Sequence, residues 1–246
     1  MKPIQLYFLH FAGGNCYSFD FLINELKKHR SQFEYLPLEL PGRGNRLDES
    51  LLTSKEEAIE DYLQQIVRKR NNAPYMIIGH SMGAALGLSV VKGLEDKNDP
   101  PFCFLATGTP GPGLHSRKDE QPVFVLSDED FKAELRKLGG VPEEILDNKD
   151  LYDFFSPIIR SDFQLLEENK GFENGLKIKT SIHALMGDEE PLVDKIKNWE
   201  KFTFGTVETQ ILRGNHFFIH RNKGKLSSVI RQHAATYKYK HIKKYN

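Results

Sequence analysis

One pentapeptide limits what this chain can fold into more than any other feature. Residues 79–83 read Gly-His-Ser-Met-Gly, which fits the pattern GxSxG. An apolar, strand-like run precedes it, and a run of small residues with helical character follows it. Between a strand and a helix, the serine of this pattern occupies a strained turn, and the flanking glycines let the backbone approach closely. A chance pentapeptide is the alternative, but the surrounding pattern favours a nucleophile elbow that exposes Ser81 above a parallel sheet.

The rest of the chain alternates short β-branched or aromatic runs with longer amphipathic runs, which is typical of βαβ units. Strands are predicted at Ile4–Leu9, Glu34–Leu38, Tyr75–Gly79, Phe102–Thr107, Thr180–Met186 and Val207–Leu212. Helices are predicted at Phe19–Lys28, Lys55–Arg70, Met82–Leu94, near Val193–Phe202 and after Arg221. Together these runs predict an α/β fold with a mostly parallel sheet flanked by helices.

The segment from about 114 to 175 breaks this alternation, because it carries helical patterns without a convincing strand. One helix is expected around Phe131 and Leu135 with Ser127 as its N-cap, and a second near Leu151–Ile159. We interpret the segment as a helical lid insertion within a single domain that spans residues 1–246.

Composition excludes several classes of function. The 246 residues carry 34 Lys and Arg against 34 Asp and Glu, so the zero net charge provides no cationic field for nucleic acid or an anionic membrane. No apolar run reaches the roughly 18 residues of a membrane span. The two cysteines, Cys16 and Cys103, lack CxxC or Cys/His spacing, so we expect neither a disulfide framework nor a zinc cluster, and a cytoplasmic location.

A serine nucleophile needs a base and an orienting acid further along the chain, in the order Ser, acid, His. His216 fits the base, because it follows the last strand on a glycine loop. Among the other histidines, His80 is expected in the core and His10 at the end of the first strand, whereas His233 and His241 are expected to be solvated.

The acid should leave the strand at 180–186, and three carboxylates follow it: Asp188, Glu189 and Glu190. Residue types and spacing do not separate them. For the oxyanion hole, the small residues after the first strand favour the main-chain N–H groups of Ala12 and Met82 as donors.

Taken together, these stretches resemble the type II thioesterases, the stand-alone editing hydrolases of nonribosomal peptide and polyketide synthases, which have the α/β-hydrolase fold. The resemblance spans nearly the whole chain. It rests on GHSMG, on FAGG at 11–14, on PGRG at 41–44, on LGGVPEE at 138–144 and on PIIRSDF at 157–163. The two motifs in the insertion are more specific than the elbow, which all α/β-hydrolases share.

The resemblance implies that Glu190 is the acid, although the family has Asp at that position; Asp188 is the alternative. A second departure is His10, where the family usually has proline. The implied substrate is an acyl or aminoacyl thioester on the phosphopantetheine arm of a carrier protein, hydrolysed by a monomer without metal or dissociable cofactor. The alternatives are a general carboxylester hydrolase or acyltransferase of the same fold, and a non-catalytic binding protein.

Arg43, in the PGRG motif, and Arg46, just after it, could contact an acidic carrier domain or the phosphate of the phosphopantetheine arm. We favour a structural role for both, in which they brace the loop through nearby carboxylates.

Overall fold

A computed structural model describes residues 2–29, 32–114, 121–168 and 172–242, with side chains described as far as residue 240. Its centre is a six-stranded sheet with the order β2-β1-β3-β4-β5-β6, in which every neighbouring pair of strands is parallel. The strands are β1 Ile4–Leu9, β2 Phe33–Pro37, β3 Tyr75–His80, β4 Cys103–Thr107, β5 Ile182–Gly187 and β6 Val207–Leu212. The predicted parallel α/β architecture is therefore confirmed, and the strand ends differ from prediction by two residues at most.

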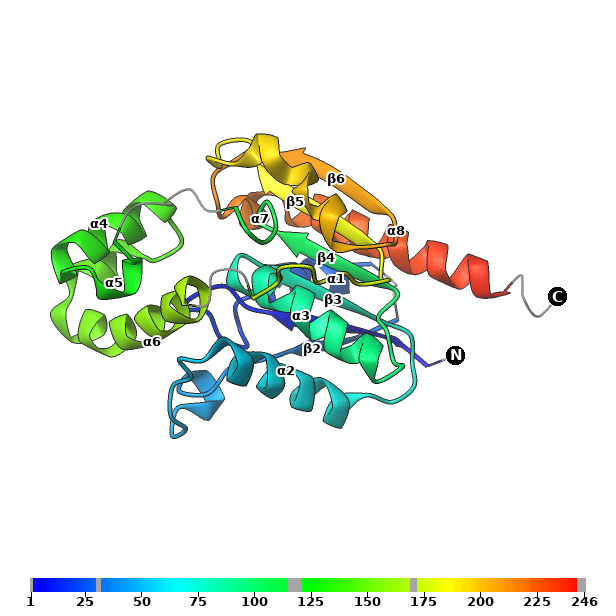
Figure 1. Ribbon diagram of the computed structural model, residues 1–246, viewed down its shortest axis with the longest axis horizontal. Helices are drawn as coiled ribbons and strands as arrows, with labels where there is room; N and C mark the ends of the chain where they lie inside the picture. The colour runs from blue at the N-terminus through cyan, green and yellow to red at the C-terminus, as the bar shows by residue number, and fades with distance from the viewer. Residues whose placement is uncertain (1, 30–31, 115–120, 169–171, 243–246) are drawn as a thin grey trace.

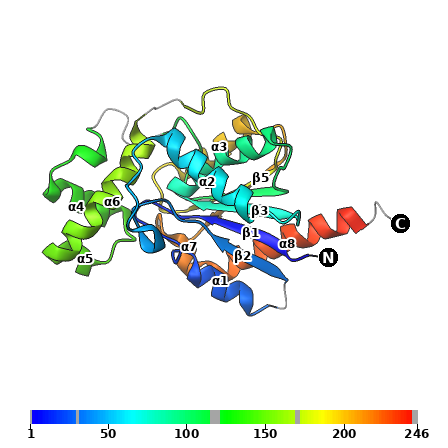
Figure 2. The ribbon, with the colours of Figure 1, turned by 90° about the horizontal axis from the view of Figure 1, so that it is seen from below.

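Helices cover both faces of the sheet (Figures 1 and 2). On one face α2 (Lys55–Lys69), α3 (Met82–Asp96) and η3 (Val193–Phe202) bury a core with strand side chains such as Leu9 and Phe104. On the other face α1 (Asp20–Lys27) and α8 (Lys223–Ile242) cover a second core around Phe8 and Leu105. Alternate residues of each strand thus point into opposite cores, as the two-residue period of a strand requires.

One predicted helix differs in type. The segment that carries Trp199 has the expected bounds, but it is a 3-10 helix (η3). Its apolar residues Ile196 and Trp199 are three apart, and side chains at i and i+3 align in a 3-10 helix as well as on one face of an α-helix. The same burial pattern therefore serves either type, and Trp199 is fully buried against the sheet.

The helical insertion of the structure comprises η2 (Val123–Val125), α4 (Asp128–Leu138), α5 (Glu143–Asp147) and α6 (Lys149–Glu167). It stands apart at one end of the sheet in both ribbon views (Figures 1 and 2). The insertion has its own small core, built on Phe131, Leu135 and Leu146. Ser127 caps α4 as predicted, by accepting the amide of Asp130 at 3.2 Å.

The last helix of the insertion, α6, is longer than the predicted 151–159 segment. It begins after Asn148, whose side chain accepts the amides of Asp150 and Leu151, and it continues through Pro157. Two short elements complete the fold, η1 (Gly44–Arg46) after β2 and α7 (Phe218–Arg221) after β6. Within the described part of the chain, no helix combines the length and the apolar character needed to cross a bilayer.

Candidate active site

Ser81 lies between β3 and α3 in a backbone conformation that side chains rarely adopt, with φ +53° and ψ −113°. Its amide donates to the carbonyl of Thr107 on β4 at 2.8 Å, which fixes the turn. The two flanking glycines are required because neither position has room for a Cβ atom. A Cβ at Gly79 would lie 2.3 Å from the carbonyl oxygen of Gly83, and one at Gly83 would lie 2.1 Å from that of Leu9. The turn can therefore form only with both glycines present.

A line of hydrogen bonds connects three loops at the carboxyl ends of β3, β5 and β6. His216 Nε2 lies 2.9 Å from Ser81 Oγ, and His216 Nδ1 lies 2.7 Å from Glu190 Oε2. A neutral imidazole that donates from Nδ1 to the carboxylate has a lone pair on Nε2 for the serine hydroxyl. The arrangement can therefore take a proton from Ser81 and stabilise the imidazolium that results.

The structure separates the three carboxylates that the sequence left open. Glu190 is buried, and its second oxygen accepts the amide of Gly187 at 2.8 Å, which holds the carboxylate toward His216. Asp188 is exposed and accepts the amide of Gly214 at 2.8 Å, so it braces the loop that carries His216. Glu189 is exposed and lines the cavity described below.

Of the predicted oxyanion donors, Ala12 lines the same cavity as Ser81, and Met82 directly follows Ser81 in the chain. Ala12 follows β1 on a turn closed by the amide of Gly14, which donates to the carbonyl of Phe11 at 2.9 Å. Met82 is the first residue of α3, where a backbone N–H has no acceptor within the helix. The positive end of the α3 dipole also favours negative charge at this position.

Two buried groups hold the loop after β1. His10 donates from Nδ1 to the carbonyl of Phe11 at 2.8 Å, while its Nε2 accepts the amide of Leu40 at 3.4 Å. Burial, together with the charge of Arg43, lowers the pKa of His10 to about 3, so its ring is neutral at physiological pH. On the other side, the amide of Gly13 donates to Asp162 Oδ2 on α6 at 2.7 Å.

Asp162 also binds Arg43 through two hydrogen bonds, of 2.5 and 2.8 Å, and both side chains are buried. Burial opposes the guanidinium charge, but the ion pair with Asp162 outweighs it and raises the pKa of Arg43. This contact joins the insertion to the loop after β2. The predicted bracing role of Arg43 is thereby confirmed.

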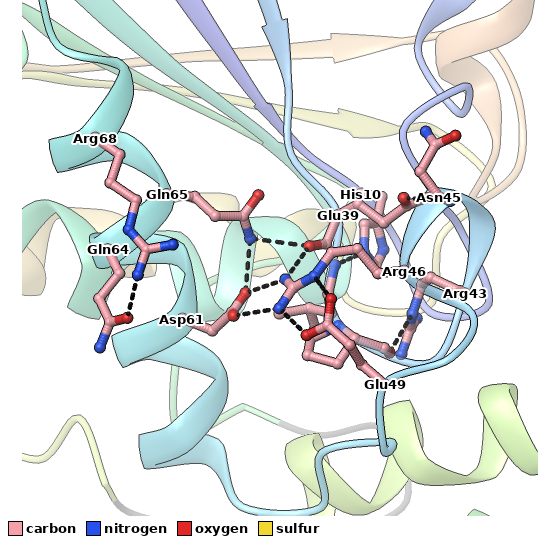
Figure 3. Close-up of polar contacts among 12 residues, drawn as sticks. His10, Glu39, Arg43, Asn45, Arg46, Glu49, Asp61, Gln64, Gln65 and Arg68 are labelled. Carbon is pink, nitrogen blue, oxygen red and sulfur yellow. Dashed lines mark hydrogen bonds and ion pairs between the residues drawn. The ribbon is translucent and has the colours of Figure 1, made fainter.

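Arg46 braces the same loop from outside, as Figure 3 shows. Its guanidinium binds Asp61 of α2 at 2.8 and 2.9 Å, Glu49 at 2.6 and 2.7 Å, and the carbonyl of Glu39 at 2.8 Å. Gln65 of α2 adds contacts to Asp61 and to the Glu39 carbonyl. The prediction that Arg46 pairs with nearby carboxylates is confirmed as well.

A cavity of about 790 Å³ lies beside Ser81 and His216. One wall comes from the loops at the end of the sheet, including Ala12 and Phe217, and the other from the insertion, including Leu135 and Ile159. Most of its lining is apolar, with a buried ion pair between Lys55 and Glu173 in its wall. A volume of this size admits an acyl chain or a small side chain next to the serine hydroxyl.

The motif PIIRSDF at 157–163 is part of the family resemblance, which assigns no role to its individual residues. The structure gives two. Arg160 donates to the carbonyls of Phe124 and Leu126 and pairs with Asp128, so it fastens η2 and α4 to α6. Asp162 reaches the loop after β1. The available signal was an arginine and an aspartate two apart, which lie on opposite sides of a helix and so can bind different partners.

Two other histidines of the described residues, His80 and His233, lie outside the hydrogen-bonded line. His80 is buried, as predicted, and bonds to Thr107 Oγ1 at 2.9 Å. The prediction that His233 is solvated is wrong, because it is half-buried and its Nε2 lies 2.8 Å from Nδ1 of His183. The side chain of His241 lies outside the described residues.

Known proteins resemble this chain over most of its length. The sequence model of the thioesterase domain family matches residues 4–236. The chain is 28% identical to thioesterase PikA5 of Streptomyces venezuelae, over 94% of this chain and 81% of the relative. It is 27% identical to the gramicidin S biosynthesis protein GrsT of Aneurinibacillus migulanus, over 89% of this chain and 84% of the relative.

Solved structures of proteins from nonribosomal peptide and polyketide pathways also resemble this chain. ClbQ from the colibactin nonribosomal peptide and polyketide pathway superposes with a TM-score of 0.83 at 27% identity, over 96% of this chain and 98% of the other. The type II thioesterase BorB from the borrelidin cluster gives a TM-score of 0.81 at 27% identity, over 94% and 92%. The family match covers nearly the whole chain and includes the elbow, the acidic loop and His216; the chain therefore belongs to the thioesterase family of hydrolases, with the α/β-hydrolase fold.

Proposed function

We propose that this protein hydrolyses acyl or aminoacyl thioesters carried on the phosphopantetheine arm of carrier proteins, and so clears stalled synthase modules. The single observation that carries the proposal is the hydrogen-bonded line Ser81–His216–Glu190 at the edge of a largely apolar cavity. Relatives that act in nonribosomal peptide and polyketide pathways support the carrier-bound substrate.

In the proposed reaction, Ser81 Oγ attacks the thioester carbonyl while His216 Nε2 takes its proton. The N–H groups of Ala12 and Met82 stabilise the tetrahedral oxyanion. As the C–S bond breaks, His216 returns the proton to the departing sulfur, and the free thiol of the arm leaves an acyl group on Ser81. Water then attacks this ester while His216 takes one of its protons. The resulting tetrahedral intermediate collapses as His216 returns that proton to Ser81 Oγ, which releases the acid and restores the serine. Glu190 orients His216 and stabilises its positive charge in both halves of the reaction.

The helical insertion acts in this proposal as a lid. Its apolar side chains form one wall of the cavity, so its movement would admit the arm and enclose the acyl chain. The enzyme works as a cytoplasmic monomer, in line with its two free cysteines, and needs no dissociable cofactor for hydrolysis.

The test compares turnover of an acylated carrier protein with that of a p-nitrophenyl ester of the same acid. We expect kcat/KM to be higher for the carrier-bound thioester. A clear preference for the free ester would instead favour the general carboxylester hydrolase.

A matched pair of variants tests the nucleophile. Ser81→Ala should lower turnover by at least about three orders of magnitude. Ser89→Ala, two turns further along α3, should leave turnover unchanged. Failure of the wild type to react with a fluorophosphonate at Ser81 would argue for a binding protein without catalysis.

A further inference from the structure

Three potential metal ligands meet on the face of the sheet that α8 covers, away from the elbow. His183 lies near the start of β5 and pairs in register with Glu208 of β6. His233, fifty residues further along the chain, reaches the same point from α8. One ligand atom from each of the three residues lies within 4.8 Å of the other two.

The spacing of these atoms suits a tetrahedral cation. His183 Nδ1 lies 2.8 Å from His233 Nε2 and 3.7 Å from Glu208 Oε2. Zinc binds imidazole nitrogen and carboxylate oxygen at about 2.0–2.2 Å, which places two ligand atoms about 3.4 Å apart at the tetrahedral angle. The observed separations lie on either side of this value. The atoms of His233 and Glu208 lie within 4.8 Å of each other, so a small adjustment of the three side chains would bring the atoms onto one ion.

The protonation of the pair also suits a metal. Two nitrogens that face each other at 2.8 Å cannot both carry a hydrogen, so at least one lone pair points into the cluster. A lone pair of this kind is what an imidazole offers to a metal ion. Glu208, whose side chain is 58% exposed, supplies a negative charge and leaves the site open to solvent.

We propose that His183, Glu208 and His233 form a site for a divalent zinc ion, with water as the fourth ligand. The ion would fasten α8 to the β5–β6 edge of the sheet. The ion would lie away from the reaction at Ser81, because His183 lies near the beginning of β5, whereas the loop that carries Glu190 follows its end. The proposal does not depend on the proposed function. The spacing of the cysteines predicted no zinc cluster, and the family resemblance implied a reaction without a metal; the site proposed here contains no cysteine and departs from the expectation that the chain binds no metal.

The experiment measures binding of ZnCl₂ to the full chain by calorimetry, after treatment with EDTA and dialysis, and follows Tm in parallel. We expect one zinc ion per chain. A zinc concentration about 100 times Kd should raise Tm by roughly 5 to 10 °C. Cobalt bound in place of zinc should show the visible absorption of a four-coordinate ion.

Four variants locate the ion. His233→Gln and Glu208→Gln should each weaken binding by at least tenfold and abolish most of the rise in Tm, while His29→Ala should bind like the wild type. His216→Ala tests whether the imidazole–carboxylate pair of the candidate active site binds the ion instead, and this variant should also retain one zinc ion. Because Glu208 is exposed on an edge strand, its variant should fold even if the His233 variant does not. The proposal is overturned if the wild type binds no zinc, or if Glu208→Gln binds it as tightly as the wild type.

Discussion

The main-chain N–H of Gly13 donates to the carboxylate of Asp162, and this 2.7 Å bond joins the loop beside the nucleophile to a helix of the insertion. Gly13 is the neighbour of Ala12, the proposed oxyanion donor. The same carboxylate binds Arg43 in a buried, bidentate ion pair. The position of the oxyanion loop therefore depends on where α6 lies.

Asp162 should matter for both stability and turnover. Asp162→Asn leaves the Arg43 charge buried without its partner, so we expect the free energy of unfolding to fall by about 3–5 kcal/mol. The double variant Arg43→Met/Asp162→Leu removes both charges and should recover most of that loss. It still leaves the Gly13 amide without its acceptor, so kcat should remain at least about tenfold low while KM changes little. Denaturant unfolding and steady-state kinetics measure the two effects. Full turnover in the double variant would show that Asp162 has no positioning role.

The two carboxylates of the acidic loop should behave differently. Glu190→Gln keeps the size of the side chain but removes the charge that orients His216, so kcat should fall by about 10³–10⁴. Asp188→Asn is the matched control. Its side chain oxygen can still accept the amide of Gly214, and turnover should stay within about threefold of the wild type. The reverse order of effects in steady-state assays would make Asp188 the acid.

Alanine at two helical glycines should have opposite effects on stability. At Gly83 a Cβ would lie 2.1 Å from the carbonyl oxygen of Leu9, a backbone atom that cannot move aside. Gly83→Ala should therefore cost more than about 3 kcal/mol. Gly224 on α8 has open space around its Cβ position, and alanine there should stabilise the protein by about 0.5–1 kcal/mol. Urea denaturation of both variants checks the pair, and a stable Gly83→Ala protein would contradict the close contact.

Stability should fall in mild acid because His10 is buried as the neutral ring. Its pKa is about 3 in the folded protein, against an ordinary value of 6.5 in the unfolded chain, so below about pH 6.5 the unfolded chain binds a proton that the folded chain excludes. The stabilisation is complete above pH 6.5, and it is lost at about 1.4 kcal/mol per pH unit as the pH falls toward 3.

The variant His10→Gln removes this titration and keeps an acceptor for the amide of Leu40. Unfolding free energies measured from pH 4 to 8 should fall less steeply for the variant than for the wild type below pH 6.5. Above pH 7 the two curves should run parallel. Equal slopes in the acid range would show that His10 is not the group responsible.

The positions of the strands along the chain and of the elbow were predictable because periodicity and glycine spacing are local signals. The type of helix was harder to predict at 193–202, because apolar residues three apart suit both an α-helix and the 3-10 helix that the structure shows. The length of α6 was underestimated because the prediction followed only the apolar residues near 151–159, whereas the helix is extended by the cap at Asn148 and continues past Pro157.

The candidate site was predictable to the level of its residue types and its loops. Choosing between Asp188 and Glu190 required knowing which way each side chain leaves a tight turn, and the amides of Gly187 and Gly214 decide that. The partner of His233 could not be found from the local pattern, because His183 lies fifty residues away. A polar ring within the apolar strand 182–187 was the one local hint.

The backbone at Ser81 adopts a conformation that suits glycine far better than serine, and every folded copy of the protein carries that tension. Replacing Ser81 by glycine would relieve this strain, so the inactive Ser81→Gly variant should also have the larger free energy of unfolding. Stability alone therefore favours glycine at position 81, and the serine is explained by its proposed role as the nucleophile and not by a contribution to folding.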